Sequence, residues 1–411
     1  MKRAELESRL LIFVTLALVA FGIVMVFSAT SAAAAVGGND PSYYLKRQGI
    51  YAVLGIVLML VAQRIDYRLL RKLAPPLVLT SIGLLVAVLA IGPSINGARR
   101  WINLGPAVFQ PSELAKLGLA VWASAYLSRH RAPQTLGELL RPVGALTGVF
   151  CVLLLFEPDL GTAIALVVML AGILLVSGTP LRVLGGATAI AGTLGVAVVW
   201  IEPYRRARVF SFLNPWNDAQ GAGFQNVQAM IGMGSGGLFG KGLGQSVEKI
   251  FYLPEAHTDM IFAIIGEELG LVGVTLVIAA YATFAYAGLK IALRCKDPFG
   301  KRLASGLTVL VCGQAAINLA AVLGLAPLTG IPLPFVSYGG SSLVVALASV
   351  GVLLNIAVNH ASSREAQVPD RGRRNGRSRA AVARNRRGAQ RARSDGDVRR
   401  VAGAGRSAAR S

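Results

Sequence analysis

The side chains that could carry chemistry are the few ionisable residues that interrupt a strongly apolar chain. Glu113 and Lys116 lie three positions apart in QPSELAKLGLA. Asp259 ends LPEAHTD, and two more acids, Glu267 and Glu268, follow it in MIFAIIGEELG. An ionisable side chain inside or at the rim of a membrane span is costly, so each of these residues is a functional hypothesis.

Asp259 has two interpretations at the start of its helix. It is either an N-cap or first-turn acid that the helix macrodipole favours, or a carboxylate at the membrane–water boundary that acts as a general base. Glu267 lies about two turns, or about 12 Å, deeper. That depth favours structural pairing of Glu267 and Glu268, with Gln314 or Asn318 of the next span as partner.

Two cations, Lys116 and Arg100, suit an anionic group. Glu113 and Lys116 share a helix face, so they form an intrahelical ion pair, or Lys116 clamps a lipid phosphate or pyrophosphate. Pro111 and Ser112 resemble a helix start, with Ser112 as N-cap. Arg100, in NGARRWINLGP, is an interfacial anchor or a phosphate contact.

Two glycine-rich stretches give weaker evidence of a functional site than these ionisable residues. MGSGGLFGKGLGQS (233–246) lacks the spacing of a phosphate-binding loop and no strand precedes it, so we interpret it as a flexible turn region. In PLTGIPLPFVSYGGSSLV (327–344), Ser337 and Tyr338 suit a substrate hydrogen bond or simple turn chemistry equally. The three cysteines and three histidines are too scattered for an obvious metal site.

The elements that must position these residues are membrane helices. Of 411 residues 54% are hydrophobic and 15% are charged, well below the roughly 25% of a soluble chain. Apolar runs of about 20 residues span a bilayer as helices, which predicts an all-α polytopic membrane protein. About ten runs fit, at 10–34, 49–65, 73–92, 111–128, 143–157, 160–178, 182–202, 259–289, 303–325 and 340–360.

Charge orients these spans. Lys and Arg concentrate in the even-numbered connections and near both termini, so both termini are expected to be cytoplasmic and the long loop 203–258 extracytoplasmic. Residues 362–411 contain 15 arginines and four acidic residues, with too few apolar residues to fold. We expect this segment to be a disordered cytoplasmic tail that binds anionic lipid or an acidic partner, and no nucleic acid.

At these residues the chain resembles the SEDS family of peptidoglycan polymerases, and its cell-division branch more than its elongation branch. The resemblance covers about residues 10–360. It rests on the stretches 96–117, 156–163, 211–270 and 332–342, of which GQSVEKIFYLPEAHTD is the most specific to the division branch. Some relatives carry a basic residue where this chain has Thr329, so no role of that residue transfers.

The resemblance implies a glycosyltransferase in residues 1–361 that polymerises lipid II into β-1,4-linked glycan at the outer face of the cell membrane, at the septum. It implies that Asp259 is the catalytic carboxylate. An α-linked donor giving a β-linked product requires one inverting displacement and one base. A class B penicillin-binding protein transpeptidase and other division proteins are the implied partners.

For the lipid pyrophosphate leaving group we expect Lys116, oriented by Glu113, and Arg100 to supply charge. His257 and Ser337 are further substrate-contact candidates. No cofactor is implied with certainty, and a divalent cation, Mg²⁺ or Mn²⁺, is an alternative source of charge. The rival functions are a lipid II flippase or transporter, an elongation-type polymerase and an inert division scaffold.

Overall fold

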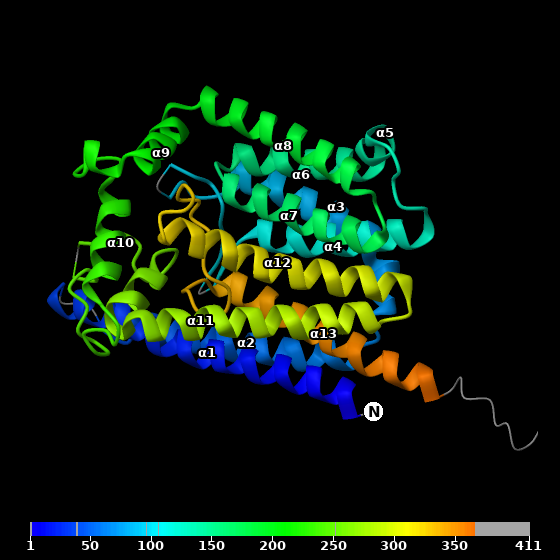
Figure 1. The fold of residues 1–411 in the computed structure, drawn as a ribbon, viewed down its shortest axis with the longest axis horizontal. Coiled ribbons are helices and arrows are strands. Elements are labelled where there is room, and N and C mark those ends of the chain that lie inside the picture. The colour runs from blue at the N-terminus through cyan, green and yellow to red at the C-terminus, as the bar shows by residue number, and fades with distance from the viewer. Residues whose placement is uncertain (1, 38–39, 96, 106, 251, 366–411) are drawn as a thin grey trace, which may run out of the picture. The chain divides into compact units, whose positions relative to one another are not determined.

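The computed structural model describes residues 2–37, 40–95, 97–105, 107–250 and 252–365. Over these residues the chain is a bundle of long helices with one small hairpin (Figure 1). The elements are, in order, α1 (Lys2–Val36), α2 (Tyr43–Arg64), α3 (Arg68–Ile91), β1 (Ile102–Leu104), β2 (Ala107–Phe109), α4 (Pro111–Arg129), α5 (Leu136–Leu139), η1 (Leu140–Gly144), α6 (Ala145–Phe156), α7 (Leu160–Ser177), α8 (Leu181–Ile201), α9 (Pro203–Leu213), η2 (Pro215–Asp218), α10 (Phe224–Ser235), α11 (Ile261–Arg294), α12 (Pro298–Val322) and α13 (Gly340–Glu365).

The prediction of a polytopic helical membrane fold is confirmed. Nine helical segments among the described residues are long and apolar enough to cross a membrane, with α5, η1 and α6 joined as one segment, Leu136–Phe156. The remaining predicted span is α4, whose 19 residues reach about 28 Å. Three charged residues, Glu113, Lys116 and Arg129, make α4 less apolar, and it lies largely buried against α3, α7 and α12. A helix inside the bundle does not need a lipid-compatible surface.

The contacts at one end of the bundle join the connections that the charge pattern predicts to be cytoplasmic. Arg294, at the end of α11, forms an ion pair with Glu7 of α1. The backbone N–H of Tyr67 donates to Asn355 Oδ1 over 2.9 Å. Arg302 donates to Ser177 Oγ over 2.8 Å. We call the opposite end, where residues 203–259 and the hairpin lie, the loop end.

Some structure at the loop end was not predicted. The connection between α3 and α4 folds into the antiparallel hairpin β1–β2, in register Ile102 with Phe109, so the fold is not purely helical. The long loop 203–258 contains the helices α9 and α10 and the turn η2. Ser112 is not an N-cap, because α4 begins at Pro111 and its N-cap is Gln110. Of the predicted disordered tail 362–411, residues 362–365 form the end of α13, and the rest, from 366 onward, lies outside the described residues.

Helix α11 is broken at Gly270, whose φ of 63° and ψ of −159° are not helical. The 24 residues after the break reach about 36 Å, which alone crosses the hydrocarbon layer. The residues before it are enclosed by protein: Ile261 to Ile265 are fully buried, whereas Leu271 after the break is 52% exposed. Glu267 and Glu268 therefore belong to a short protein-enclosed segment next to the loop end.

Candidate functional site

Asp259 lies where three segments of the loop end meet. It directly precedes Met260, the N-cap of α11. Its backbone carbonyl accepts a hydrogen bond of 2.7 Å from Asn318 Nδ2 of α12, and the same amide donates to the carbonyl of Ile331 over 2.8 Å. A Cβ on Gly330 would approach Asp259 Oδ2 to 3.9 Å. Asn318 thus holds the backbone of Asp259 against the segment that enters α13, and leaves its carboxylate half-buried.

The surroundings of Asp259 make its carboxylate a better base than a free one. Burial, followed by the negative charge of Glu255, raises the pKa of Asp259 from 3.8 to about 6, while the charge of Arg208 opposes this. Thr258 Oγ1 donates to Asp259 Oδ1 over 3.3 Å. A carboxylate with a pKa near 6 is ionised at neutral pH, and takes a proton more readily than an ordinary aspartate.

His257 lies in an aromatic cluster next to Asp259. Its ring centroid is 4.6 Å from that of Tyr44 and 5.6 Å from that of Tyr338. Its carbonyl accepts a hydrogen bond of 2.9 Å from the backbone N–H of Tyr338. Burial lowers the pKa of His257, against the charge of Glu255, so the imidazole is neutral at pH 7. It can offer a substrate a hydrogen bond or a stacking face.

Ser337 is buried, and its hydroxyl and carbonyl oxygens accept hydrogen bonds from other residues of the chain. Its hydroxyl accepts a 2.8 Å hydrogen bond from the backbone N–H of Leu333, and its carbonyl accepts one from Gln48 Nε2 over 3.2 Å. These contacts favour the turn-chemistry interpretation of Ser337 over substrate contact.

Lys116 and Glu113 form the ion pair that their spacing predicts. Lys116 Nζ lies 2.8 Å from Glu113 Oε2, and the two side chains are only 2% and 6% exposed. The ammonium therefore has its counter-charge inside the bundle. This geometry favours structural pairing over a free clamp for a phosphate.

Arg100 binds the turn between α6 and α7. Its Nε donates to the carbonyl of Glu157 over 2.9 Å, and its Nη2 donates to that of Pro158, which has a φ of 31°. Asp159 caps α7 by accepting from Thr162 N–H over 3.0 Å. The half-buried guanidinium thus anchors this turn, where the sequence predicted an interfacial anchor or a phosphate contact.

Glu157 is the unusual acid of this turn. Its side chain is fully buried, and neither carboxylate oxygen has a hydrogen-bond partner in the described part of the chain. Burial, with the charge of Asp159, raises the pKa of Glu157 from 4.5 to about 8, against the charge of Arg100. Glu157 is therefore mostly protonated at neutral pH.

Arg208 is a residue that sequence reasoning missed. It comes from α9, and its Nη1 donates to the carbonyl of Leu328 over 3.2 Å, two residues before Gly330. Its guanidinium lies 4.9 Å from the centroid of the Tyr204 ring, and its charge acts on Asp259. The loop 203–258 has five basic residues without a distinguishing pattern, so only the path of α9 identifies this one.

Glu267 and Glu268 are paired, as the sequence predicted, but with other partners. Glu267 binds Lys241 at 2.7 Å and Glu268 binds Lys249 at 2.8 Å. The prediction that they pair with α12 was wrong: both acids bind lysines of the loop 203–258, and Asn318 donates to backbone carbonyls instead. The stretch 233–246 contains turns with four glycines at positive φ, yet it is anchored to α11 by Lys241, so it is not simply a flexible region.

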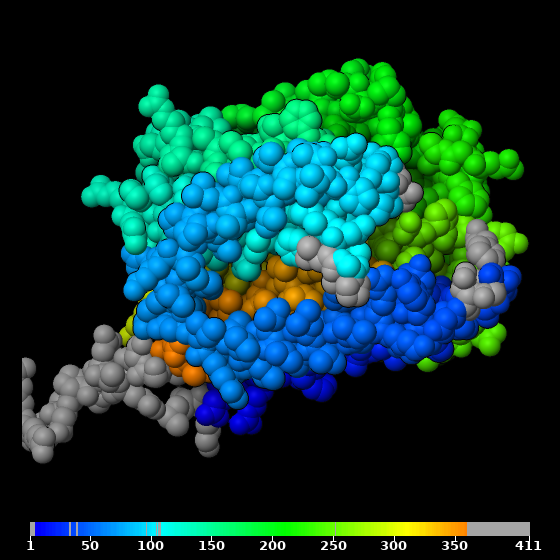
Figure 2. Space-filling model, turned by 180° about the vertical axis from the view of Figure 1, so that it is seen from behind, coloured from blue at the N-terminus to red at the C-terminus, as the bar shows by residue number. Residues whose placement is uncertain are grey.

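The face opposite to that of Figure 1 is hollowed. Figure 2 shows a groove between α2 and α3, with α13 visible at its floor in orange. The hairpin contacts the start of α13: Ser341 Oγ donates to the carbonyl of Val108 over 3.0 Å and accepts from Gln110 N–H over 3.1 Å. All three helices are predominantly apolar.

The described residues include no group of three His, Cys, Asp or Glu side chains placed to hold a metal ion.

Comparisons with known proteins agree with this architecture. The sequence model of a family described as "Cell cycle protein", FTSW_RODA_SPOVE, matches residues 8–362. A protein of Geobacter sulfurreducens named "Probable peptidoglycan glycosyltransferase FtsW" is 42% identical over 359 residues, covering 87% of this chain and 96% of that protein. "Stage V sporulation protein E" of Bacillus subtilis is 39% identical over 354 residues, covering 85% and 96%.

Solved structures share the fold. A chain of the structure described as "Structural coordination of polymerization and crosslinking by a peptidoglycan synthase complex" superposes with a TM-score of 0.71 at 34% identity, over 85% of this chain and 97% of that one. Rod shape determining protein RodA of Thermus thermophilus gives a TM-score of 0.63 at 33% identity, over 85% and 96%.

Proposed function

The chain belongs to the FtsW, RodA and SpoVE family of cell cycle proteins, and from this we propose that it is a peptidoglycan glycosyltransferase that polymerises lipid II into β-1,4-linked glycan. The observation that carries the proposal is the half-buried carboxylate of Asp259 at the loop end, on which the charge of Arg208 acts. One base with a raised pKa, together with a cation whose charge reaches it, suits an inverting transfer from a diphosphate donor.

In this mechanism Asp259 removes the proton from the acceptor sugar 4-hydroxyl. The hydroxyl oxygen attacks the anomeric carbon of the growing chain, and the bond to the lipid diphosphate breaks in the same step. The proton ends on Asp259 and the electron pair leaves with the diphosphate. Because the pKa of Asp259 is about 6, the carboxylate is ready to accept a proton at neutral pH and readily returns it to water.

Arg208 is our candidate for neutralising the leaving diphosphate. A guanidinium presents a fork of donors that matches phosphate oxygens. Lys116 and Arg100 were the expected cations, but Lys116 is paired with Glu113 at 2.8 Å and Arg100 donates to backbone carbonyls. We therefore propose that Lys116, Glu113 and Arg100 support the site's shape.

The groove between α2 and α3 suits the isoprenoid chain of lipid II, because it is lined by apolar helices and ends beneath the hairpin at the loop end (Figure 2). A prenyl chain in this groove would keep the sugar and diphosphate headgroup at the loop end. His257, near Asp259, is the candidate sugar contact there.

The partner and place of action follow from the relatives. One structural neighbour comes from a complex described as coordinating polymerization and crosslinking, so we propose a class B penicillin-binding protein transpeptidase as partner. Action at the division septum, with other division proteins, is supported by 42% identity over 359 residues to a protein named FtsW. We further propose that the arginine-rich residues 362–411 bind anionic lipid or an acidic cytoplasmic protein.

The test is polymerisation by the full-length chain, purified in detergent with its transpeptidase partner and supplied with lipid II. We expect glycan strands from the wild type and from Glu202→Gln, which alters the exposed acid directly before the loop 203–258, and almost none from Asp259→Asn. A lipid transporter is the second candidate, because the same cations and groove could move a lipid diphosphate. Detergent offers no membrane to cross, so absence of polymer together with lipid II transport in vesicles would favour the transporter.

A further inference from the structure

A buried ion pair closes the segment that carries Asp259. Lys249 and Glu268 are 19 residues apart in the chain, and Asp259 lies near the midpoint between them. Lys249 Nζ is 2.8 Å from Glu268 Oε1, and the two side chains are 1% and 0% exposed. The residues between them therefore form a loop whose two ends are tied together at its base.

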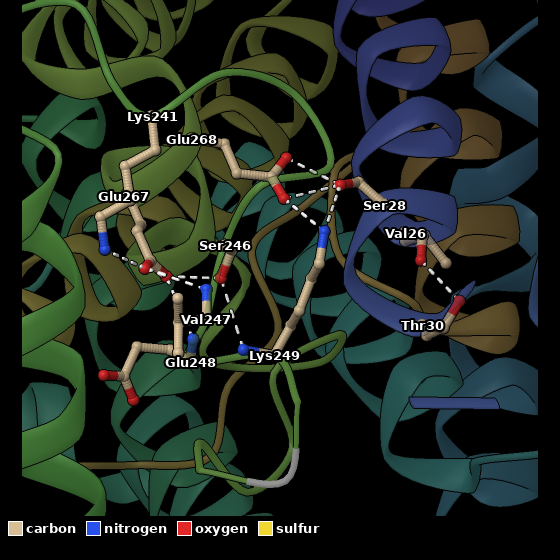
Figure 3. Close-up of polar contacts among 10 residues, drawn as sticks. All are labelled: Val26, Ser28, Thr30, Lys241, Ser246, Val247, Glu248, Lys249, Glu267 and Glu268. Atoms are coloured by element: carbon tan, nitrogen blue, oxygen red, sulfur yellow. Dashed lines mark hydrogen bonds and ion pairs between the residues drawn. The ribbon is translucent and has the colours of Figure 1, made fainter. Parts of the chain in front are cut away.

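The first helix takes part in this closure. Ser28 Oγ of α1 lies 2.7 Å from each carboxylate oxygen of Glu268 and 3.3 Å from Lys249 Nζ (Figure 3). The hydroxyl can donate to the carboxylate while it accepts from the ammonium. Residues from the start of the chain, the long loop and α11 thus meet in one set of hydrogen bonds. We call Ser28, Lys249 and Glu268 the clamp.

A second set of contacts surrounds the clamp. Glu267 binds Lys241 Nζ at 2.7 Å and accepts from Ser246 Oγ and from the backbone N–H of Val247 (Figure 3). The segment at Gly240 and the backbone of α11 approach too closely for a side chain between them, since a Cβ on Gly240 would lie 2.1 Å from the carbonyl oxygen of Glu268. Residues 240–249 are therefore fitted to the end of the short helix that begins just after Asp259.

Stability alone is a poor explanation of such a pair. Burying two charges is costly, and apolar residues of similar size usually stabilise a core at least as well. An ion pair with a shared hydroxyl instead fixes the relative position of the three segments that carry it, because its directional hydrogen bonds are all satisfied in one arrangement only. Catalysis depends on such precision, since a displacement of about 1 Å can cost about 10²-fold in rate.

We propose that Lys249, Glu268 and Ser28 are positioning residues, which fix the segment between Lys249 and Glu268 so that Asp259 faces the acceptor hydroxyl. This inference rests on the proposed function of Asp259. The clamp touches no substrate and acts only through the backbone that it closes.

The test replaces the clamp by apolar side chains in the full-length protein, as the triple variant Lys249→Met, Glu268→Met, Ser28→Ala. We expect its melting temperature to stay within about 3 °C of that of the wild type, because the core remains filled. The kcat of polymerisation should fall by at least about tenfold with KM little changed. Amide hydrogen exchange of residues 252–260 should become at least about tenfold faster.

The control is Lys46→Met with Asp40→Asn, which removes an ion pair whose side chains are 66% and 52% exposed and should change none of the three readouts. If the triple variant does not fold, Glu268→Asp, which keeps the charge but shortens the reach, should still lower kcat. Wild-type kcat in the triple variant, or in Glu268→Asp, would overturn the proposal. Hydrogen exchange needs no activity, so unchanged exchange refutes the clamp even if the wild type proves to be no polymerase.

Discussion

The buried carboxyl of Glu157 predicts a specific dependence of stability on pH. Its pKa is raised from 4.5 to about 8, chiefly by burial. Between these two pH values the unfolded chain has an ionised Glu157 and the folded protein a protonated one, so the folded state binds one proton more. Its contribution to stability is complete below about pH 4.5 and is lost as the pH rises to about 8.

The size of the effect follows from linkage. One extra bound proton lowers the free energy of unfolding by about 1.4 kcal/mol per pH unit, or by about 2.7 kcal/mol between about pH 5.5 and 7.5. For a chain of this size that is about 3–4 °C in melting temperature. Glu157→Gln keeps the shape and cannot ionise, so it should lack this loss.

The assay is thermal unfolding of the wild type and Glu157→Gln in detergent across that pH range, with Glu202→Gln as an exposed control. Other groups titrate in all three proteins, so the difference in melting temperature between variant and wild type isolates Glu157. We expect this difference to grow with pH in favour of Glu157→Gln. A constant difference from about pH 5.5 to 7.5 would refute the burial of an unpartnered carboxyl at this position.

The other predictions concern the charges of the site. The raised pKa of Asp259 predicts that kcat/KM falls tenfold per pH unit below about pH 6, which a pH–rate profile measures. Arg208→Gln removes the charge that lowers this pKa, so the acid limb should move to higher pH and kcat should fall by about 10²-fold. Lys116→Met leaves Glu113 as an unpaired buried charge and should lower the free energy of unfolding by about 3–5 kcal/mol. The further change Glu113→Gln should recover most of this loss, as measured by thermal unfolding.

The membrane fold could be predicted from the sequence because the signal is local. Each span is an apolar run of about 20 residues, and basic residues mark one side of the membrane. The pair Glu113–Lys116 was likewise foreseen, since three residues on a helix determine a shared face. The hairpin at residues 102–109 was missed because its strands have only three residues each, too short for an alternating pattern.

The rest of the loop end depends on contacts between distant segments. Ser28 and Glu268 are 240 residues apart in the chain, and no spacing rule joins them. The break at Gly270 was hidden, because glycine is frequent in membrane helices and a single one does not mark a turn. Without that break Glu267 and Glu268 seemed to lie deep in a span facing α12, so Lys241 and Lys249 were not considered as partners.

The most direct test of the proposed catalytic role is the initial rate of glycan polymerisation by Asp259→Asn beside wild type and Glu202→Gln, at equal amounts of folded protein and with the proposed transpeptidase partner present. Asparagine keeps the shape of the side chain and loses its basicity. We expect a rate about 10²–10⁴-fold below wild type for Asp259→Asn and an unchanged rate for Glu202→Gln. Polymer made by Asp259→Asn at the wild-type rate would contradict the proposed role.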